Sequence, residues 1–399
     1  MQIILVIDYI NKRIPGGPNG VAYDTVEGLK KNNKRLENED IHVRIMSKTG
    51  TGFQSISETD EKFSNITFEY FKKITPTSLC SDLNYYLHIK SKKDTLDLLH
   101  SHDVSGALAG AVLKIPTVLT LHGILWKEKY YTSDFSSRLA IEINILRFRY
   151  LSSRLKKIFA ISPYVINEVD EFLQKGFPSM EVIENPVSDL FFNLDKQEEE
   201  GLMIFPGLIN PRKNQINLIK ALDLLKKDRI KFHCVLPGPI GDHGYFTELQ
   251  RLIKQYDLER DVAILGPIPF EQLLRLYSRA SLMITTSLQE TAPMVISEAM
   301  ATKTPVIASD ISGIPYMVAT GKSGFLINPH DLTGISDQIR ILLDDNSLRK
   351  KFGEESQRIA ASRWKSEVIV NKQLDQYTSI IHKNHEGSIF RPGLPAMKR

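Results

Sequence analysis

Short apolar runs alternate with amphipathic segments throughout the second half of the chain. The apolar runs lie at Leu202–Phe205, Phe232–Leu236, Val262–Leu265, Leu282–Ile284, Val306–Ala308 and Phe325–Ile327. Segments with the helical spacing of apolar residues separate most of them, at Asn214–Lys227, Tyr245–Tyr256, Phe270–Arg279, Pro293–Thr302 and Leu332–Leu343. Buried strands that alternate with helices in this way predict a doubly wound α/β domain with a parallel sheet.

The first half of the chain shows the same alternation less regularly. Strand-like runs lie at Ile3–Asp8, Ile41–Met46, Ile66–Phe71 and Ile158–Ile161, and residues 94–123 have the pattern strand, helix, strand. Helices are predicted at Val21–Lys31, Leu83–Lys92 and Asp134–Leu155. The polar stretch 47–64 is predicted to be a long loop. This half therefore forms a second α/β domain of the same class.

The length of 399 residues also requires two domains. We place the first domain at 1–193, a charged linker at 194–201 and the second domain at 202–363. A last helix is predicted at 364–381. The tail 382–399 shows no periodicity, and we expect it to be disordered or derived from cloning.

Composition narrows the class of protein. The net charge of +4 is too small to indicate nucleic-acid binding. No apolar run approaches the roughly 20 residues that span a bilayer. The start MQIILVIDY has no basic segment before its apolar run, and the chain has only two cysteines, so a cytoplasmic location is expected.

Two glutamates flank the start of a predicted helix in the second domain. Glu290 lies in the loop before Pro293, and Glu298 lies on the face of the helix away from its apolar residues. A carboxylate beside a helix N-terminus suits a ligand that carries both hydroxyl groups and an anion. A pair of solvated surface glutamates is the alternative for this pattern alone.

The wider context resembles the retaining GT-B glycosyltransferases of family 4. Glu290 and Glu298 have the E-x7-E spacing, and PVIAS, a loop at Ser312–Gly313 and GFLINPHD follow them. The resemblance continues in the segment ending at His122 and Gly123 and extends over nearly the whole chain. It implies two Rossmann-like domains that face each other across a cleft, with the last helix crossing back to the first domain.

The resemblance also implies roles for individual residues. Glu290 and the backbone of the four residues after it would hold the donor sugar, and Glu298 would hold the ribose. His122 would lie beside the donor sugar, and Lys213 and Arg212 would face the diphosphate. The complete set of implied site residues is Gly16, Gly17, His122, Trp126, Arg212, Lys213, Pro269, Glu290, Thr291, Ala292, Pro293, Met294 and Glu298.

Within this set, the glycine-rich turn and the base-binding loop are the weakest signals. Gly16 and Gly17 precede a helix, which suits a phosphate, but they do not form G-x-G-x-x-G. They are assigned to the acceptor, and Gly17 also to the donor diphosphate. Pro269 lies in a loop that the resemblance places at the nucleotide base, although its proline can simply stiffen a turn.

One position departs from the family pattern. Leu208 stands where G-R-L-x-x-x-K-[GN] has arginine, whereas Lys213 matches. A cation at a helix start is unfavourable unless an anion lies nearby, so Lys213 indicates an anion site. The chain is expected to be a hexosyltransferase. A UDP-sugar is the favoured donor, and a GDP-sugar is the second choice. The alternatives are a nucleotide-binding scaffold with little turnover and another GT-B activity, such as a phosphorylase or epimerase.

Two further features of the sequence bear on metal binding and on membrane contact. His100 and His102 share a strand face without a third ligand, so a structural role is favoured, and no metal or other cofactor is expected. Trp126 begins an aromatic and basic segment that fits a lipid-linked saccharide acceptor at the inner face of the cytoplasmic membrane. A solvated loop fits it equally well. Family resemblance further implies a role in bacterial surface polysaccharide synthesis.

Overall fold

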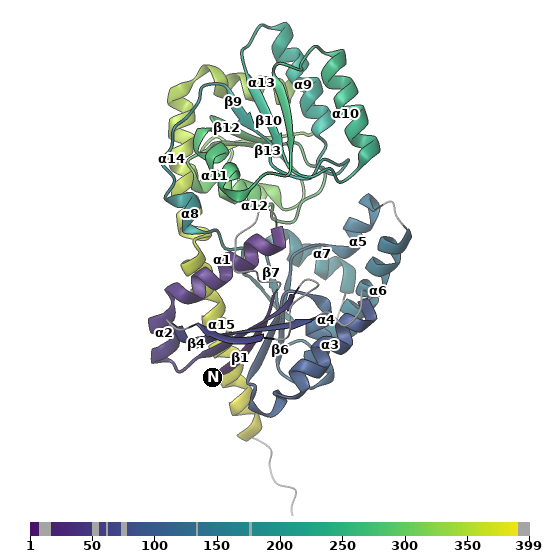
Figure 1. The fold of residues 1–399 in the computed structure, drawn as a ribbon, viewed down its shortest axis with the longest axis vertical. Helices are drawn as coiled ribbons and strands as arrows, with labels where there is room; N and C mark the ends of the chain where they lie inside the picture. Colours follow the sequence, from purple (N-terminus) through teal and green to yellow (C-terminus); the bar gives the residue numbers. More distant parts are fainter. Residues whose placement is uncertain are drawn as a thin grey trace, which may run out of the picture.

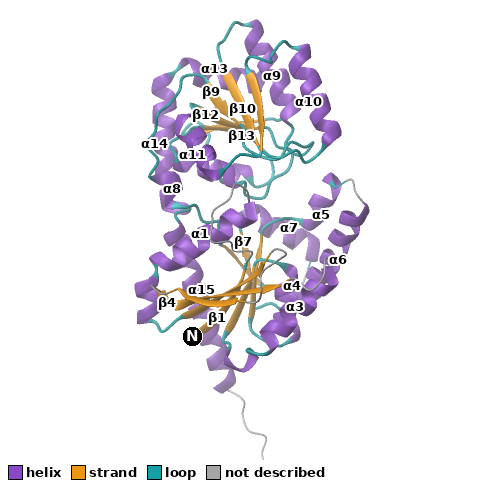
Figure 2. Cartoon of the chain, viewed as in Figure 1, coloured by secondary structure: helices purple, strands orange, loops and turns teal. Residues whose placement is uncertain are grey.

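The computed structural model describes residues 1–7, 17–49, 56–60, 63–72, 78–132, 135–174 and 178–389. Two sheets, each covered by helices on both faces, form two domains that lie one above the other (Figure 1). Strands occupy the middle of each domain and helices its outside (Figure 2). Among the described residues, no helix has both the length and the apolar character needed to cross a bilayer.

The second domain has the sheet that its sequence pattern predicts. Its six parallel strands run in the order β11-β10-β9-β12-β13-β14. Their bounds are β9 Leu202–Ile204, β10 His233–Pro237, β11 Val262–Gly266, β12 Leu282–Thr285, β13 Val306–Ser309 and β14 Gly324–Ile327. The order reverses between β9 and β12, and ligands of such sheets bind at the carboxyl ends of the strands beside this switch point.

The helices of this domain form two layers. One core contains residues of α9 Gln215–Lys227, α10 His243–Gln255 and α13 Leu332–Asp344. The other contains residues of α8 Asp189–Phe192, α11 Phe270–Arg279, α12 Met294–Ala301 and α14 Asn346–Arg363. A 3-10 turn at Ile314–Tyr316 follows β13. The sheet is buried on both sides, which explains why its strands are continuous apolar runs.

The first domain has an eight-stranded sheet in the order β3-β4-β2-β1-β5-β6-β7-β8. The strands are β1 Gln2–Val6, β2 His42–Thr49, β3 Ile56–Asp60, β4 Phe63–Lys72, β5 Leu98–Ser101, β6 Thr117–Leu121, β7 Lys157–Ala160 and β8 Ser179–Val182. The prediction of one long loop at 47–64 was wrong, because β2 continues to Thr49 and β3 pairs antiparallel with β4. An edge strand can form through backbone pairing alone, so a polar sequence does not exclude it.

Helices also cover both faces of this sheet. They are α1 Gly17–Lys31, α2 Asn33–Asn38, α3 Ser78–Lys90, α4 Val104–Val112, α5 Leu125–Glu128, α6 Phe135–Ser152, α7 Pro163–Leu173 and α15 Ser366–Ile389, with 3-10 turns at Lys93–Thr95 and Lys129–Tyr131. The core around α1 includes Ile369, Val370, Leu374 and Tyr377 of α15. The last helix therefore crosses back to the first domain, as predicted, and Figure 1 shows it along the lower domain.

Two crossings of the chain join the domains, and they are bonded to each other. Val187 N donates to Trp364 O at 2.7 Å, and Ser366 N donates to Val187 O at 3.2 Å. Val187 and Phe191 pack in the core of the second domain, so packing moves the boundary from residue 193 to about residue 187. The linker 194–201 lies along the second domain, where Gln197 N donates to Ser278 O at 2.9 Å.

The end of the chain differs from the expectation of a disordered tail after residue 381. Helix α15 continues to Ile389, and residues 390–399 lie outside the described part. Among the side chains of this helix that the structure describes, Ile380 and Ile381 are the last ones in the core of the first domain.

Candidate functional site

Three charged side chains meet at the carboxyl edge of the second sheet. Lys213 Nζ lies 2.5 Å from Glu290 Oε1, and Arg212 NH1 lies 3.3 Å from Glu290 Oε2. Lys213 and Arg212 end the loop between β9 and α9, and Glu290 lies in the loop between β12 and α12. These are the two strands at the switch point. The structure therefore brings together three of the residues that the family resemblance implies for the site.

The cluster is buried and carries more positive than negative charge. Glu290 is 6 % exposed and Lys213 is 8 % exposed. Burial raises the pKa of the Glu290 carboxyl, but the charges of Lys213 and Arg212 outweigh it, so the pKa is lower than usual. Glu290 is ionised at neutral pH and neutralises one of its two cations. The remaining positive charge suits an anionic ligand at the edge of the sheet.

The loop that carries Glu290 is fixed by close backbone contacts. Gly313 N donates to Glu290 O at 2.9 Å. A Cβ at position 313 would lie 1.7 Å from Thr291 O, so only glycine permits this approach. Ser162 of the first domain donates its hydroxyl to Thr291 O at 2.9 Å. The predicted donor-binding backbone is thereby held from both domains.

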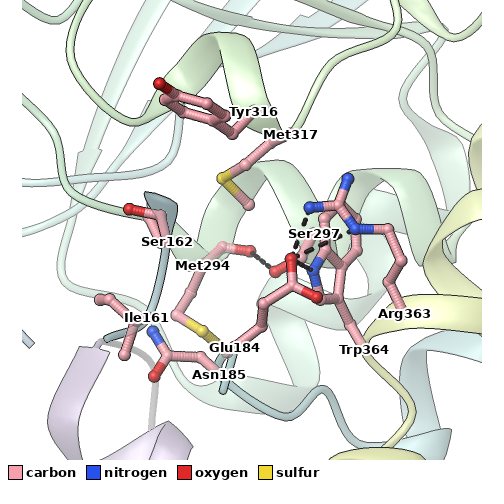
Figure 3. Close-up of a pocket in the computed structure, with 11 residues that line it drawn as sticks. Ile161, Ser162, Glu184, Asn185, Met294, Ser297, Tyr316, Met317, Arg363 and Trp364 are labelled. Carbon is pink, nitrogen blue, oxygen red and sulfur yellow. Dashed lines mark hydrogen bonds and ion pairs between the residues drawn. The ribbon is translucent and has the colours of Figure 1, made fainter. Parts of the chain in front are cut away.

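A small cavity of about 10 Å³ lies behind this loop, between the two domains. Figure 3 shows Ser162 and Asn185 of the first domain facing Met294, with Tyr316 and Met317 on the far side. Glu184, next to Asn185, accepts a hydrogen bond from Trp364 Nε1 at 2.9 Å and pairs with Arg363 at 2.5 Å (Figure 3). The cavity has room for about one water molecule, so it is part of the joint between the domains.

Glu298 is buried, which corrects its predicted place on a non-core face. Its side chain is 5 % exposed, and Tyr277 OH donates to Glu298 Oε2 at 3.0 Å. Helix α12 contacts α14 and α8 as well as the sheet, so nearly all of its faces are covered. A single apolar stripe predicts burial correctly only for a helix with one covered face. The assignment of Glu298 to a ribose remains a prediction.

His122 follows β6 and ends a chain of polar contacts in the first domain. His122 Nε2 lies 2.9 Å from His102 Nδ1. His100 has other partners, with Nδ1 2.5 Å from Tyr377 OH and Nε2 2.7 Å from Thr120 Oγ1. Burial lowers the pKa of His122 to about 4, although a hydrogen bond with Asn185 raises it. His122 is therefore neutral at pH 7 and can act through hydrogen bonds, not through charge.

Sequence reasoning missed Glu128, a carboxylate of the first domain that interacts with the cluster. Helix α5 folds this side chain back over the chain, and a Cβ on Gly123 would lie 2.0 Å from Glu128 Oε1. Burial raises the pKa of Glu128, the charge of Arg212 lowers it and the charge of Glu290 raises it. These interactions cross from one domain to the other. No motif spacing indicates Glu128, because only the short helix brings it to the site.

The other predicted residues lie at separate places. Gly17 begins α1 with open space beside its Cα, and Gly16 is outside the described residues. Pro269 caps α11 directly after β11. Trp126 stacks on Phe172 with ring centroids 3.9 Å apart and donates through Nε1 to Glu168 Oε2 at 3.2 Å. That packing uses one face of the indole, and its role with an acceptor remains a prediction.

Leu208 leaves the arginine position of the family pattern without a charge. Its side chain is 39 % exposed at the end of β9. Arg212 instead reaches the cluster, where it also donates to Gln289 O at 3.0 Å. In the described part of the chain, no three His, Cys, Asp or Glu side chains group as metal ligands.

Comparison with known proteins identifies the class that this fold and site define. Residues 187–359 match the family Glycosyl transferases group 1, and residues 34–189 match Glycosyltransferase Family 4. The structure resembles sucrose-phosphate synthase from Thermosynechococcus elongatus with a TM-score of 0.74, 18 % identity and coverage of 96 % and 99 % of the two chains. It resembles Anabaena HepE, solved with UDP and glucose, with a TM-score of 0.70, 21 % identity and coverage of 95 % and 100 %.

The fold is therefore that of a two-domain GT-B glycosyltransferase. The chain belongs to the group 1 glycosyltransferases, with a family 4 first domain. It is 28 % identical over 272 residues to an uncharacterized glycosyltransferase of Methanocaldococcus jannaschii, covering 66 % of this chain and 70 % of that one. It is 26 % identical over 316 residues to N-acetyl-alpha-D-glucosaminyl L-malate synthase of Bacillus anthracis, covering 75 % and 79 %.

Proposed function

We propose that this protein is a metal-independent, retaining hexosyltransferase that moves a sugar from a nucleotide-sugar donor to a saccharide or lipid-linked saccharide. The observation that carries the proposal is the Lys213–Glu290–Arg212 cluster at the switch point of the second sheet. Its two cations, Lys213 and Arg212, suit the diphosphate that leaves with the nucleotide. A UDP-sugar is the first choice and a GDP-sugar the second, because solved HepE complexes contain UDP, UDP-glucose or UDP with glucose.

Each residue has a role in this scheme. Lys213 and Arg212 stabilise the departing diphosphate, while Glu290 orients both cations and binds the donor sugar together with the Thr291–Met294 backbone. Glu298 binds the ribose, Pro269 borders the base, and Gly17 faces the diphosphate and the acceptor. Neutral His122 hydrogen-bonds the donor sugar.

The proposed reaction breaks the bond between the anomeric carbon and the phosphate oxygen. The acceptor oxygen forms the new bond on the same face of the sugar, and its proton passes to the departing phosphate oxygen. The phosphate leaves with the bonding electron pair, so charge and atoms balance. Isolation of a covalent glycosyl–enzyme intermediate would contradict this front-face displacement.

The proposal is tested by nucleotide binding and turnover. Thermal shift with UDP, GDP, ADP and their sugar conjugates, with and without EDTA, should identify one nucleotide whose effect EDTA does not change. A ligand at about 100 times its Kd stabilises the folded state by ~2.7 kcal/mol. Nucleotide binding without transfer or donor hydrolysis would instead favour the scaffold alternative that Leu208 suggests. No binding of any nucleotide would contradict both.

An exposed apolar stripe supports contact with a membrane surface. Phe135, Leu139, Leu146 and Tyr150 lie on α6 and are 81 %, 50 %, 64 % and 45 % exposed. At 100° per residue they fall within one narrow sector of the helix. Arg138, Arg149 and Arg154 lie on the same helix or just after it. A lipid interface would cover such apolar side chains, while arginines favour anionic headgroups.

This membrane contact fits an acceptor that is lipid-linked and a role in bacterial surface polysaccharide synthesis at the cytoplasmic face. Flotation with vesicles of phosphatidylcholine and phosphatidylglycerol tests it. Phe135→Ser together with Leu146→Ser should abolish flotation and leave UDP binding unchanged. Leu83→Ser together with Leu87→Ser on α3, whose apolar side chains are 54 % and 49 % exposed, provides the matched control. Equal flotation of all three proteins would exclude α6 as the contact.

A further inference from the structure

A pocket of about 510 Å³ lies at the carboxyl ends of three adjacent strands of the second domain. Leu288 follows β12, Asp310 and Ile311 follow β13, and Asn328 and His330 follow β14. Tyr131 of the first domain completes the lining. A volume of this size is within the roughly 300–1,000 Å³ of small-ligand sites. Most of the lining therefore comes from the second domain, and Tyr131 adds one side chain from the first.

The pocket adjoins the loop that carries Glu290 of the charged cluster. It lies on the β13 and β14 side of that cluster. Leu288 is two residues from Glu290, and its backbone N–H donates to Arg212 O at 2.7 Å. In the sheet order, β13 and β14 extend away from the switch point in one direction, while β9, β10 and β11 extend in the other. A nucleotide assigned to Pro269 after β11 and to the β9 loop leaves the β13 and β14 side unoccupied.

The lining combines polar groups that have no protein partner with an apolar floor. Within the described residues, no hydrogen bond or ion pair engages the Asp310 carboxylate, the His330 imidazole or the Tyr131 hydroxyl. Leu288 and Ile311 supply apolar surface beside them. An aromatic ring, an apolar floor and scattered hydrogen-bonding groups match a sugar ring, which has apolar C–H faces and a rim of hydroxyls.

Other ligand classes match less well. The lining has no Lys or Arg to hold a phosphate, and it has one carboxylate, whereas Ca²⁺ takes six to eight oxygen ligands. An uncharged saccharide fits this lining better than a phosphate or Ca²⁺ does. The position of the pocket also fits an acceptor saccharide, because the pocket adjoins the loop that carries Glu290.

We propose that this pocket is the subsite for the second saccharide unit of the acceptor, one residue beyond the unit that receives the donor sugar. This assignment rests on the proposed transferase function. Tyr131 precedes α6 in the chain, so one lining residue of the pocket lies near in sequence to the helix that carries the stripe proposed to contact the membrane. Acceptor binding would hold the two domains in the arrangement that the structure shows.

Saturation-transfer NMR on the full chain with UDP tests the subsite. The probes are lactose, maltose, cellobiose, isomaltose and gentiobiose, with glucose and galactose as single-ring comparisons. At least one disaccharide should bind, and Tyr131→Ala or Asp310→Asn should weaken it about three- to tenfold without changing the affinity for single sugars. Tyr130→Ala is the matched control, because its neighbouring side chain is 79 % exposed and outside the pocket lining.

The outcomes separate this inference from the proposed function. UDP binding by calorimetry is measured on the same samples. If UDP binds but no disaccharide depends on Tyr131 or Asp310, the subsite is excluded and the transferase proposal stands. Equal weakening by Tyr130→Ala would also exclude it. If UDP does not bind, the proposed function fails, and pocket-dependent disaccharide binding would then show a saccharide site without an acceptor role.

Discussion

Lys213 Nζ and Glu290 Oε1 lie 2.5 Å apart, although the two residues are 77 positions apart in the chain. The contact joins the loops after the two central strands of the second sheet, β9 and β12. It is buried, so removing Glu290 would leave the Lys213 charge without its ion-pair partner in a site of low dielectric. The pair therefore has two roles, one in stability and one in the proposed chemistry. Substitutions can separate these roles.

Lys213→Ala should lower the transfer rate about 10²–10³-fold, because a buried cation that stabilises a departing anion is lost. The Glu290 carboxylate would keep Arg212 as a partner, so the protein should still fold. Steady-state kinetics with a UDP-sugar and a thermal melt measure the two effects. Lys227→Ala is the control, since Lys227 lies at the far end of α9, the helix that follows Lys213, with 66 % of its side chain exposed. Equal losses in both variants would remove Lys213 from the mechanism.

Leu208→Arg should tighten UDP binding about tenfold, because it restores a charge-assisted contact to the diphosphate. The exposed position at the end of β9 gives the new side chain room. Calorimetric titration with UDP measures the change. Leu190→Arg, at a site that is 45 % exposed on α8, controls for the added charge. Unchanged or weaker UDP binding in Leu208→Arg would place the diphosphate elsewhere.

The sequence predicted the elements correctly where a strand is buried on both faces. It predicted them poorly where burial or pairing depends on a neighbouring helix or strand. All six strands of the second sheet were predicted, because strands covered on both faces are uninterrupted apolar runs. The β3 edge strand was missed, because its pairing needs only backbone groups. Glu298 was expected on an uncovered face but is buried, because packing of α12 against α14 and α8 cannot be known from the helix alone.

The candidate site divides in the same way. Lys213, Arg212 and Glu290 were predicted from motif spacing, and the parallel strands bring them together. Glu128 was not predicted, because its position follows from the short α5 helix that folds it onto Gly123. The pocket beside Tyr131 was not predicted either, since its lining comes from four separate loops. Contacts between domains leave no local pattern in the sequence.

Glu128→Gln should lower transfer about tenfold, because it removes a buried carboxylate of the first domain whose charge interacts with Arg212. Burial raises the pKa of this carboxyl, so protonation would remove its charge on the acid side of the profile. The rate of the native enzyme should therefore fall toward low pH, and the variant should show a flatter acid limb. Glu142→Gln on α6, at a side chain that is 43 % exposed, is the control. An unchanged pH profile in Glu128→Gln would assign the limb to another group.

Acid should destabilise the fold through its buried histidines. Burial lowers the pKa of His100 to about 3 and that of His122 to about 4, whereas an unfolded histidine titrates near 6.5. Below pH 6.5 the unfolded chain binds protons that the folded chain does not, so the free energy of unfolding should fall between pH 6.5 and about 4. Each histidine contributes about 1.4 kcal/mol per pH unit.

Urea unfolding between pH 4.5 and 7 measures this slope. His100→Gln keeps groups that can bond to Tyr377 and Thr120 but removes the titration, so the slope should become shallower by the contribution of one histidine. His243→Gln, at an exposed residue of α10, provides the comparison. Parallel slopes for the native protein and His100→Gln would show that His100 is not the group responsible.

Gly313→Ala should abolish donor binding with a small effect on global stability. The added Cβ would lie 1.7 Å from Thr291 O, so the loop that carries Glu290 must move away from its hydrogen bond with Gly313 N. That movement would separate Glu290 from Lys213 and weaken UDP binding. Gly244→Ala is a matched control, because its nearest atom would be 3.4 Å away and alanine is the better helix former. UDP titration and thermal melts on both variants distinguish the cases. A large loss of melting temperature in Gly313→Ala would indicate a role in the core. Normal UDP binding would show that the donor does not depend on this loop.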